Sequence, residues 1–104
     1  MKNRQHRIED QCCLCGTRHL LTFHHLIPRS CHRNKWFRKH FTLADMKERG
    51  ITLCRKCHSF IHRQHSEKTL GRHYNTLAAL LADETISTYA AWAARRVSDR
   101  DQLS

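Results

Sequence analysis

Two pairs of cysteines have the spacing of a structural zinc site. Cys12 and Cys15 form one Cys-x2-Cys pair, and Cys54 and Cys57 form a second pair farther along the chain. Together the pairs supply four thiolates to one tetrahedral zinc ion and leave no coordination position open. The spacing therefore predicts a closed, structural zinc site. Cys13 does not have the Cys-x2-Cys spacing to Cys15, so we interpret it as a thiol that packs or that supports the metal ligands. The alternative is that Cys13 competes for the place of Cys12.

Histidines supply a second set of candidate metal ligands. His58 and His62 are four residues apart, so on a helix both imidazoles lie on one face, about one turn from each other. The remaining ligands have to come from elsewhere, and His24 and His25 form the other adjacent histidine pair in the chain. Neighbouring side chains of a strand face opposite ways, so these two histidines are expected to divide the roles of metal ligand and base.

The composition favours a small nucleic-acid-binding domain. The chain has 104 residues, with 19 Lys and Arg against 9 Asp and Glu, and a formal net charge of +10. The hydrophobic core of a chain of this length gives only marginal stability without an added cross-link, and a bound zinc ion would supply one. The charge favours a polyanionic partner over an ordinary basic soluble domain, and it does not fit a redox or metal-storage protein.

The six cysteines predict metal binding in a reducing compartment. No apolar leader follows Met1, and the chain has no long apolar run that would contact a membrane. Where thiols stay reduced, paired Cys-x2-Cys spacings indicate metal ligands more often than disulfides. We therefore expect a cytoplasmic protein without a membrane partner.

Local patterns predict the elements that must position these residues. Residues 20–27 are rich in β-favouring side chains and end at a proline, which predicts an edge strand carrying the histidine pair. Residues 43–49 predict a short capped helix, and residues 51–53 a second strand that leads into the helix with His58 and His62. The predicted fold is α+β, a small ββα finger with zinc knuckles and additional C-terminal helices.

One domain is expected over residues 1–104. Residues 1–10 predict a basic N-terminal arm, and residues 11–63 the zinc-stapled core. Residues 66–98 carry apolar side chains at helical spacing, which predicts two amphipathic helices with a break near 82–85 and their apolar faces in the core.

Residues 29–40 form the most basic stretch and contain Trp36 and Phe37. Cations interleaved with aromatic side chains favour contacts with a nucleic-acid backbone. The alternative is a solvated basic face with both aromatic side chains in the core. The candidate nucleic-acid-binding residues are Arg29, Arg33, Lys35, Arg38 and Lys39.

These motifs together resemble the zinc-stapled HNH endonucleases over residues 11–63. The resemblance rests on three segments in order: Cys12-x2-Cys15, His24-His25-Leu26-Ile27-Pro28 and Leu53-Cys54-x2-Cys57-His58-x3-His62. It implies a ββα-metal finger with His25 as the general base. The implied ligands of a catalytic divalent ion are His24, His58 and His62.

The resemblance implies metal-dependent hydrolysis of DNA, or alternatively RNA, to a 5′-phosphate and a 3′-hydroxyl. Imidazole ligands are softer than the oxygen ligands that magnesium prefers, so manganese, nickel, cobalt or zinc is expected at the catalytic site, with magnesium also allowed. Cutting both strands with one small site would need a homodimer or two successive nicks. The alternative function is a non-catalytic nucleic-acid-binding module with a vestigial HNH site.

The chain departs from the family pattern at the middle asparagine. That residue usually lies just ahead of the second zinc knuckle, which is the turn with Cys54 and Cys57. In this chain residues 48–51 there read Glu-Arg-Gly-Ile. Asn34 is the only asparagine between His25 and Cys54, and it is our candidate for this catalytic role through a rearranged loop. The alternatives are that Gly50 forms the turn without a side chain, or that the site is less well oriented.

Overall fold

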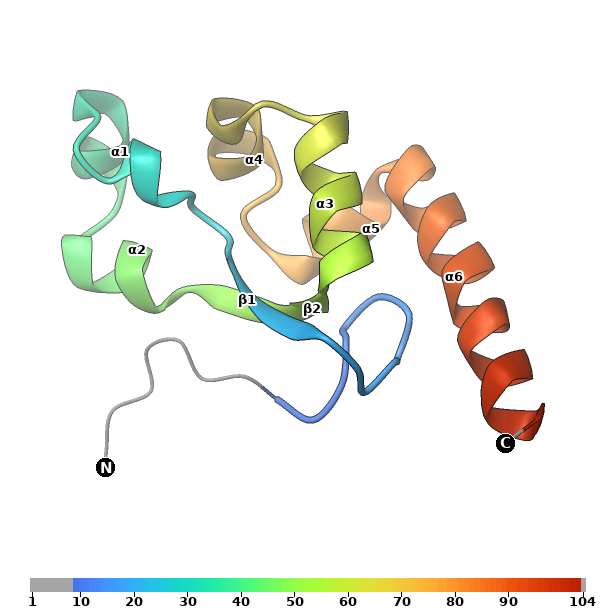
Figure 1. The fold of residues 1–104 in the computed structure, drawn as a ribbon. Coiled ribbons are helices and arrows are strands. Elements are labelled where there is room, and N and C mark those ends of the chain that lie inside the picture. The colour runs from blue at the N-terminus through green and yellow to red at the C-terminus, as the bar shows by residue number, and fades with distance from the viewer. Residues whose placement is uncertain (1–8, 104) are drawn as a thin grey trace.

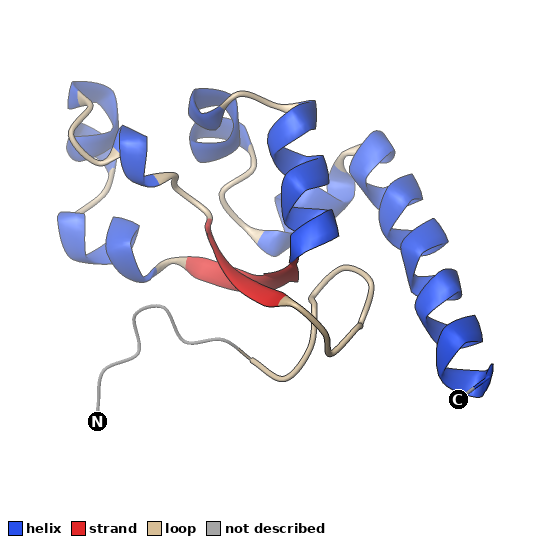
Figure 2. Cartoon of the chain, viewed as in Figure 1, coloured by secondary structure: helices blue, strands red, loops and turns tan. Residues whose placement is uncertain are grey.

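The fold is α+β and is arranged around a two-stranded antiparallel sheet (Figure 2). The structure is a computed structural model that describes residues 9–103, with the side chains of residues 9–98. The predicted arm of residues 1–10 therefore lies almost entirely outside the described residues. The first zinc knuckle, which is the turn with Cys12 and Cys15, precedes the sheet. Helices follow each strand, so the chain returns to the sheet between its two helical parts (Figure 1).

The strands place the histidine pair on opposite faces of the sheet. β1 (Leu21–His25) runs antiparallel to β2 (Gly50–Cys54), and the register sets His25 opposite Gly50. Because side chains alternate along a strand, His24 and His25 point to different faces. Both predicted strands are confirmed, and β1 is shorter at each end than the sequence predicted.

Three short helical segments between the strands enclose a small core of their own. They are η1 (Arg29–Cys31), α1 (Lys35–His40) and α2 (Leu43–Glu48). α2 confirms the predicted helix over 43–49, and the hydroxyl of Thr42 caps it by accepting from the Asp45 amide at 3.0 Å. The buried side chains of this core are Ile27, Cys31, Phe37 and Met46.

Four helices follow β2. They are α3 (Arg55–Gln64), α4 (Glu67–His73), α5 (Leu77–Ala82) and α6 (Glu84–Leu103). The sequence predicted two helices after α3, but the structure has three, because Ser66 and Thr76 each cap a separate helix. The break near 82–85 is confirmed at Asp83, and α6 continues beyond residue 98, where the predicted helices ended.

The main core joins the cysteine cluster to the C-terminal helices. Each helix after β2 contributes a fully buried aliphatic side chain: Ile61, Leu70, Leu80 and Ile86. Burial of one such side chain stabilises a fold by about 1.5–3 kcal/mol. The apolar faces of these helices therefore belong to the core, as predicted.

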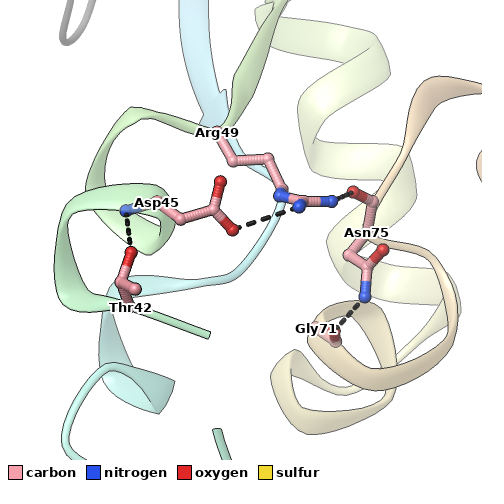
Figure 3. Close-up of polar contacts among 5 residues, drawn as sticks. All are labelled: Thr42, Asp45, Arg49, Gly71 and Asn75. Atoms are coloured by element: carbon pink, nitrogen blue, oxygen red, sulfur yellow. Dashed lines mark hydrogen bonds and ion pairs between the residues drawn. The ribbon is translucent and has the colours of Figure 1, made fainter. Parts of the chain in front are cut away.

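Arg49 ties α2 to the loop between α4 and α5 (Figure 3). Its guanidinium donates from Nη2 to Asp45 Oδ2 at 3.1 Å and from Nη1 to the Asn75 carbonyl at 3.2 Å. The carbonyl of Arg49 accepts from the Leu26 amide at 3.1 Å. The chain just after the histidine pair is therefore bonded to the residue that connects the two helical parts of the fold.

Asp83 caps α6, and its removal is expected to destabilise the fold. Its Oδ2 accepts from the Ile86 amide at 3.0 Å, and its Oδ1 lies 3.4 Å from His65 Nε2. The Ile86 amide, and then the charge of His65, lower the pKa of Asp83 below its usual value of 3.8. Asp83→Ala should reduce the free energy of unfolding at neutral pH by about 1 kcal/mol, as measured by urea denaturation.

Asp83→Asn is the matched control, because asparagine caps a helix about as well as aspartate. The folded pKa of Asp83 is lowered, so its charge stabilises the fold above pH 3.8, and that contribution disappears as the pH falls through the lowered value. The difference in free energy of unfolding between wild type and Asp83→Ala should therefore become smaller in that pH range. Equal stability of wild type and Asp83→Ala at neutral pH would contradict the capping role.

Candidate metal centres

The four predicted cysteine ligands form one buried cluster that could hold a metal such as zinc. The sulfur atoms of Cys12, Cys15, Cys54 and Cys57 lie within 4.8 Å of one another. The Sγ atoms of Cys15 and Cys54 are 3.7 Å apart. Two sulfurs of a tetrahedral zinc site with Zn–S bonds of about 2.3 Å lie about 3.8 Å apart, so the spacing fits zinc.

Both knuckles bring backbone amides to their first cysteine. The amides of Leu14 and Cys15 donate to Cys12 Sγ at 3.4 and 3.5 Å, and the amide of Cys57 donates to Cys54 Sγ at 3.4 Å. The chain turns back after the first knuckle at Gly16, whose φ of 82° suits a residue without a side chain. The same amides would donate hydrogen bonds to metal-bound sulfurs.

The protonation of the cluster also fits a bound cation. A hydrogen bond between Cys12 and Cys57 lowers the pKa of Cys12 to about 4 and raises the pKa of Cys57. Burial raises the pKa of Cys15 to about 11. The raised pKa values of Cys15 and Cys57 show that these thiols resist ionising beside Cys12, and a divalent cation would compensate the charge of four thiolates.

The remaining cysteines lie outside this cluster. Cys13 is exposed, so a packing role for its thiol is wrong, and support of the metal ligands by Cys13 stays a prediction. Cys12, and not its neighbour, supplies the sulfur to the cluster. Cys31 is buried in the small core, where its thiol lies 3.7 Å from the Glu67 carbonyl.

The structure also brings three predicted histidine ligands together. The ligand atoms of His24, His58 and His62 lie within 4.8 Å of one another, and their ring centroids are 5.0 to 5.4 Å apart. His24 comes from β1, whereas the other two come from successive turns of α3. His58 and His62, four residues apart on α3, therefore lie close to His24 on β1, as the sequence predicted.

His24 is the most deeply buried of the three. Its side chain is 0% exposed, and neither ring nitrogen forms a hydrogen bond with the residues that the structure describes. Burial, and then the charges of His58 and His62, lower the pKa of His24 to about 3. The ring is therefore neutral at physiological pH. A buried nitrogen without a partner is costly, and coordination of a metal by its lone pair would satisfy it.

Thr22 sets the orientation of His58. The Thr22 hydroxyl donates to the Leu53 carbonyl at 2.7 Å and lies 2.8 Å from His58 Nδ1. Because the hydroxyl proton is used by the carbonyl, we infer that His58 Nδ1 carries a proton and donates it to Thr22. His58 Nε2 then keeps its lone pair for a metal. Sequence reasoning missed Thr22, although it shares the strand face of His24.

Thr22→Val should weaken binding of a divalent ion at the three histidines by about 10- to 100-fold, the usual effect of losing such a supporting contact. The substitution keeps the shape of the side chain and removes the hydroxyl that holds His58. Isothermal titration calorimetry of the zinc-loaded protein would measure the affinity. Thr52→Val is the control, because the Thr52 hydroxyl accepts from the Glu9 amide on the other face of the sheet. Equal affinities for the two variants would contradict this role.

His25 ends β1 on the face away from His24. Its half-buried ring lies between two other aromatic rings, with its centroid 5.0 Å from that of Phe23 and 6.0 Å from that of His32. His32 is itself fixed, because its Nε2 lies 2.8 Å from the Ile27 carbonyl. His25 also stays close enough to His24 for its charge to lower the pKa of that residue.

Gly50 leaves room for this arrangement. It lies opposite His25 in the sheet, and a Cβ at this position would overlap the ring of Phe23. Gly50 is the first residue of β2 and leaves space for the ring of Phe23, which contacts His25. A glycine is therefore needed here for a close approach of this ring, and Gly50 does not form a turn.

Asn34 caps α1. Its Oδ1 accepts from the amides of Trp36 and Phe37 at 2.9 and 3.4 Å. This is a structural role, and catalysis by Asn34 stays a prediction. A short polar residue directly before a helical pattern was the signal for such a cap.

The basic stretch is divided between surface and core. The five predicted nucleic-acid-binding residues are all exposed: Arg29, Arg33, Lys35, Arg38 and Lys39. Phe37 is buried, and the half-buried ring of Trp36 contacts the Arg72 guanidinium at 4.2 Å and the His40 ring at 4.1 Å. Phe37 is therefore a core residue, as the alternative predicted, whereas contact of the half-buried Trp36 with a nucleic acid stays a prediction.

No helix within residues 9–103 has the length and apolar composition needed to cross a membrane. Comparisons with protein-family models, curated proteins and solved structures gave no match to this chain.

Proposed function

We propose that the protein is a metal-dependent endonuclease of the HNH type that hydrolyses DNA phosphodiester bonds. The observation that carries this proposal is the convergence of His24, His58 and His62 within 4.8 Å, from a strand and a helix, next to His25. The order of strand, strand and helix, with cysteine pairs ahead of β1 and at the start of α3, supports a zinc-stapled ββα-metal finger.

In this proposal His24, His58 and His62 hold a divalent ion, which would neutralise charge that develops on the scissile phosphate. His25 accepts a proton from the attacking water, whose oxygen bonds to phosphorus while the bond to the 3′-oxygen breaks. The 3′-oxygen takes a proton from solvent. The products are a 5′-phosphate and a 3′-hydroxyl.

The surface charge supports a nucleic-acid substrate. The net charge of +10 would attract a phosphate backbone over a long range, and the exposed cations of the basic stretch would bind its phosphates. DNA is the proposed substrate, with RNA as the alternative polymer.

One observation favours a second function, a DNA-binding module without catalysis. The Oδ1 atom of Asn34 is engaged in capping α1, which is a structural role. A nuclease would need Asn34 to leave this cap or would act without the asparagine of an HNH site. The three converging histidines favour the nuclease more strongly, because a binding module has no need of them.

Plasmid nicking by the zinc-loaded protein tests the proposal. Supercoiled plasmid should be converted to nicked circles when manganese, nickel, cobalt, zinc or magnesium is added, with the softer ions faster than magnesium. Chelation of the added ion should stop the reaction. Tight DNA binding without nicking under all five ions would favour the binding module and overturn the nuclease.

A further inference from the structure

A cleft lies between α3, α6 and the first knuckle, away from the basic stretch of residues 29–40. Its volume is about 640 Å³. α6 runs beside α3 in Figure 1, and side chains from both helices form the walls. The cleft could not be predicted from the sequence, because its lining comes from separate segments between Cys15 and Val97.

The cleft is lined by cations. Arg55, Lys56 and Arg63 contribute from α3, and Arg96 contributes from α6. Within the described part of the chain, no Asp or Glu side chain lines it. Cys15, Cys54 and Cys57 of the zinc cluster also line the cleft, and their thiolate charge is partly compensated by the ion they would hold. The four cations leave the concave surface with a net positive charge, which is complementary to a chain of phosphates.

The cleft also presents an exposed aromatic side chain. Trp92 is 46% exposed, although it is among the largest apolar side chains of the protein. Its neighbour Tyr89 stacks on Phe60 with ring centroids 3.9 Å apart, and the Trp92 ring lies 5.7 Å from that of Tyr89. The Arg96 guanidinium lies 5.0 Å from the Trp92 ring. An exposed indole beside cations is a typical platform for an unpaired base.

The cleft adjoins the histidine site on the same helix. Successive residues of an α-helix are about 100° apart around the axis. Ser59 and Arg63 line the cleft, and they directly follow His58 and His62 in the sequence. A strand bound at the histidines can therefore continue around α3 into the cleft.

We propose that this cleft binds a single-stranded DNA segment next to the cleavage site, with one base stacked on Trp92 and phosphates on Arg55, Arg63 and Arg96. A base has to be unpaired to stack on a protein side chain in this way, so the cleft selects substrates with a single-stranded extension. The choice of DNA rests on the proposed function, which this inference deepens by naming the form of the substrate.

Fluorescence anisotropy of two labelled DNAs tests the inference. One is a blunt duplex, and the other is the same duplex with a single-stranded extension. The zinc-loaded protein is used without added divalent ion, so that binding is measured without cleavage. Wild type should bind the extended DNA at least about fivefold more tightly, as one stacked base predicts. Trp92→Ala should remove this preference, whereas Trp92→Phe should retain most of it.

Two matched controls separate the cleft from general effects. Leu43 is also 46% exposed but lies on α2, so Leu43→Ala should keep the preference. Arg95 and Arg96 are exposed neighbours on α6, and only Arg96 lines the cleft. Arg96→Gln should reduce the slope of log affinity against log salt for the extended DNA by about 0.7, and Arg95→Gln by less.

Several results would overturn the inference. These are an unchanged preference in Trp92→Ala, equal effects of Arg95→Gln and Arg96→Gln, tighter binding of an RNA extension than a DNA extension, or a wild-type dimer that Trp92→Ala dissociates. The last result would make the cleft an interface between two copies. If the protein nicks plasmid DNA but does not prefer the extended DNA, only the inference about the cleft is refuted. If it prefers the extended DNA but does not nick the plasmid, only the proposed nuclease function is refuted.

Discussion

Replacing Cys54 by serine is expected to unfold the protein and release its zinc. Cys54 ends β2 and caps α3, and its sulfur lies 3.7 Å from Cys15 Sγ. A structural zinc site contributes on the order of 10 kcal/mol to folding, which is comparable to the whole stability of a small domain. Far-UV circular dichroism and elemental analysis of the purified variant would measure the loss of helix and of zinc.

Cys13→Ser and Cys31→Ser are the controls for this experiment. Cys13 is exposed beside Cys12, and Cys31 is buried in the other core, so each tests a thiol outside the cluster. Both variants should stay folded and retain one zinc ion per chain. A folded Cys54→Ser protein without zinc would contradict the structural role of the cluster.

His25→Ala is expected to lose DNA cleavage while it stays folded and keeps both metal sites. His25 lies on the face of β1 away from the buried His24, so its removal leaves the three converging histidines in place. Loss of a general base typically lowers the rate by about 10²- to 10⁴-fold. Plasmid nicking rates at saturating divalent ion would measure the effect.

His58→Ala is the informative partner of this variant. It removes a candidate ligand, so it should lose both nicking and binding of the second divalent ion. His73→Ala, an exposed histidine on α4, should retain both. If His25→Ala nicks DNA at the wild-type rate, or loses the second ion as His58→Ala does, the division of roles between the two faces of β1 is wrong.

The metal-ligand clusters could be predicted because their signals are local. A Cys-x2-Cys turn or two histidines one helical turn apart fix the relative direction of two side chains before any tertiary contact forms. The pairs then had few possible partners in a chain of 104 residues. The structure confirms that Cys12 and Cys15 meet Cys54 and Cys57.

Contacts that depend on tertiary packing could not be predicted. Thr22 reaches His58 because the sheet lies against α3, and no spacing in the sequence encodes that contact. The bond from Arg49 to the Asn75 carbonyl joins residues that are 26 positions apart in the chain. The capping role of Asn34 could have been predicted, because a short polar residue stands directly before a helical pattern. The resemblance to HNH endonucleases instead implied a catalytic role for it.

A parallel titration of the zinc-loaded protein with manganese tests the central claim most directly, with bound manganese measured by electron paramagnetic resonance and plasmid nicking measured in the same samples. We predict that one manganese ion binds per chain and that the nicking rate saturates at the same manganese concentration. A folded protein that binds no manganese at the histidines, or that binds one ion without nicking DNA, would contradict the claim.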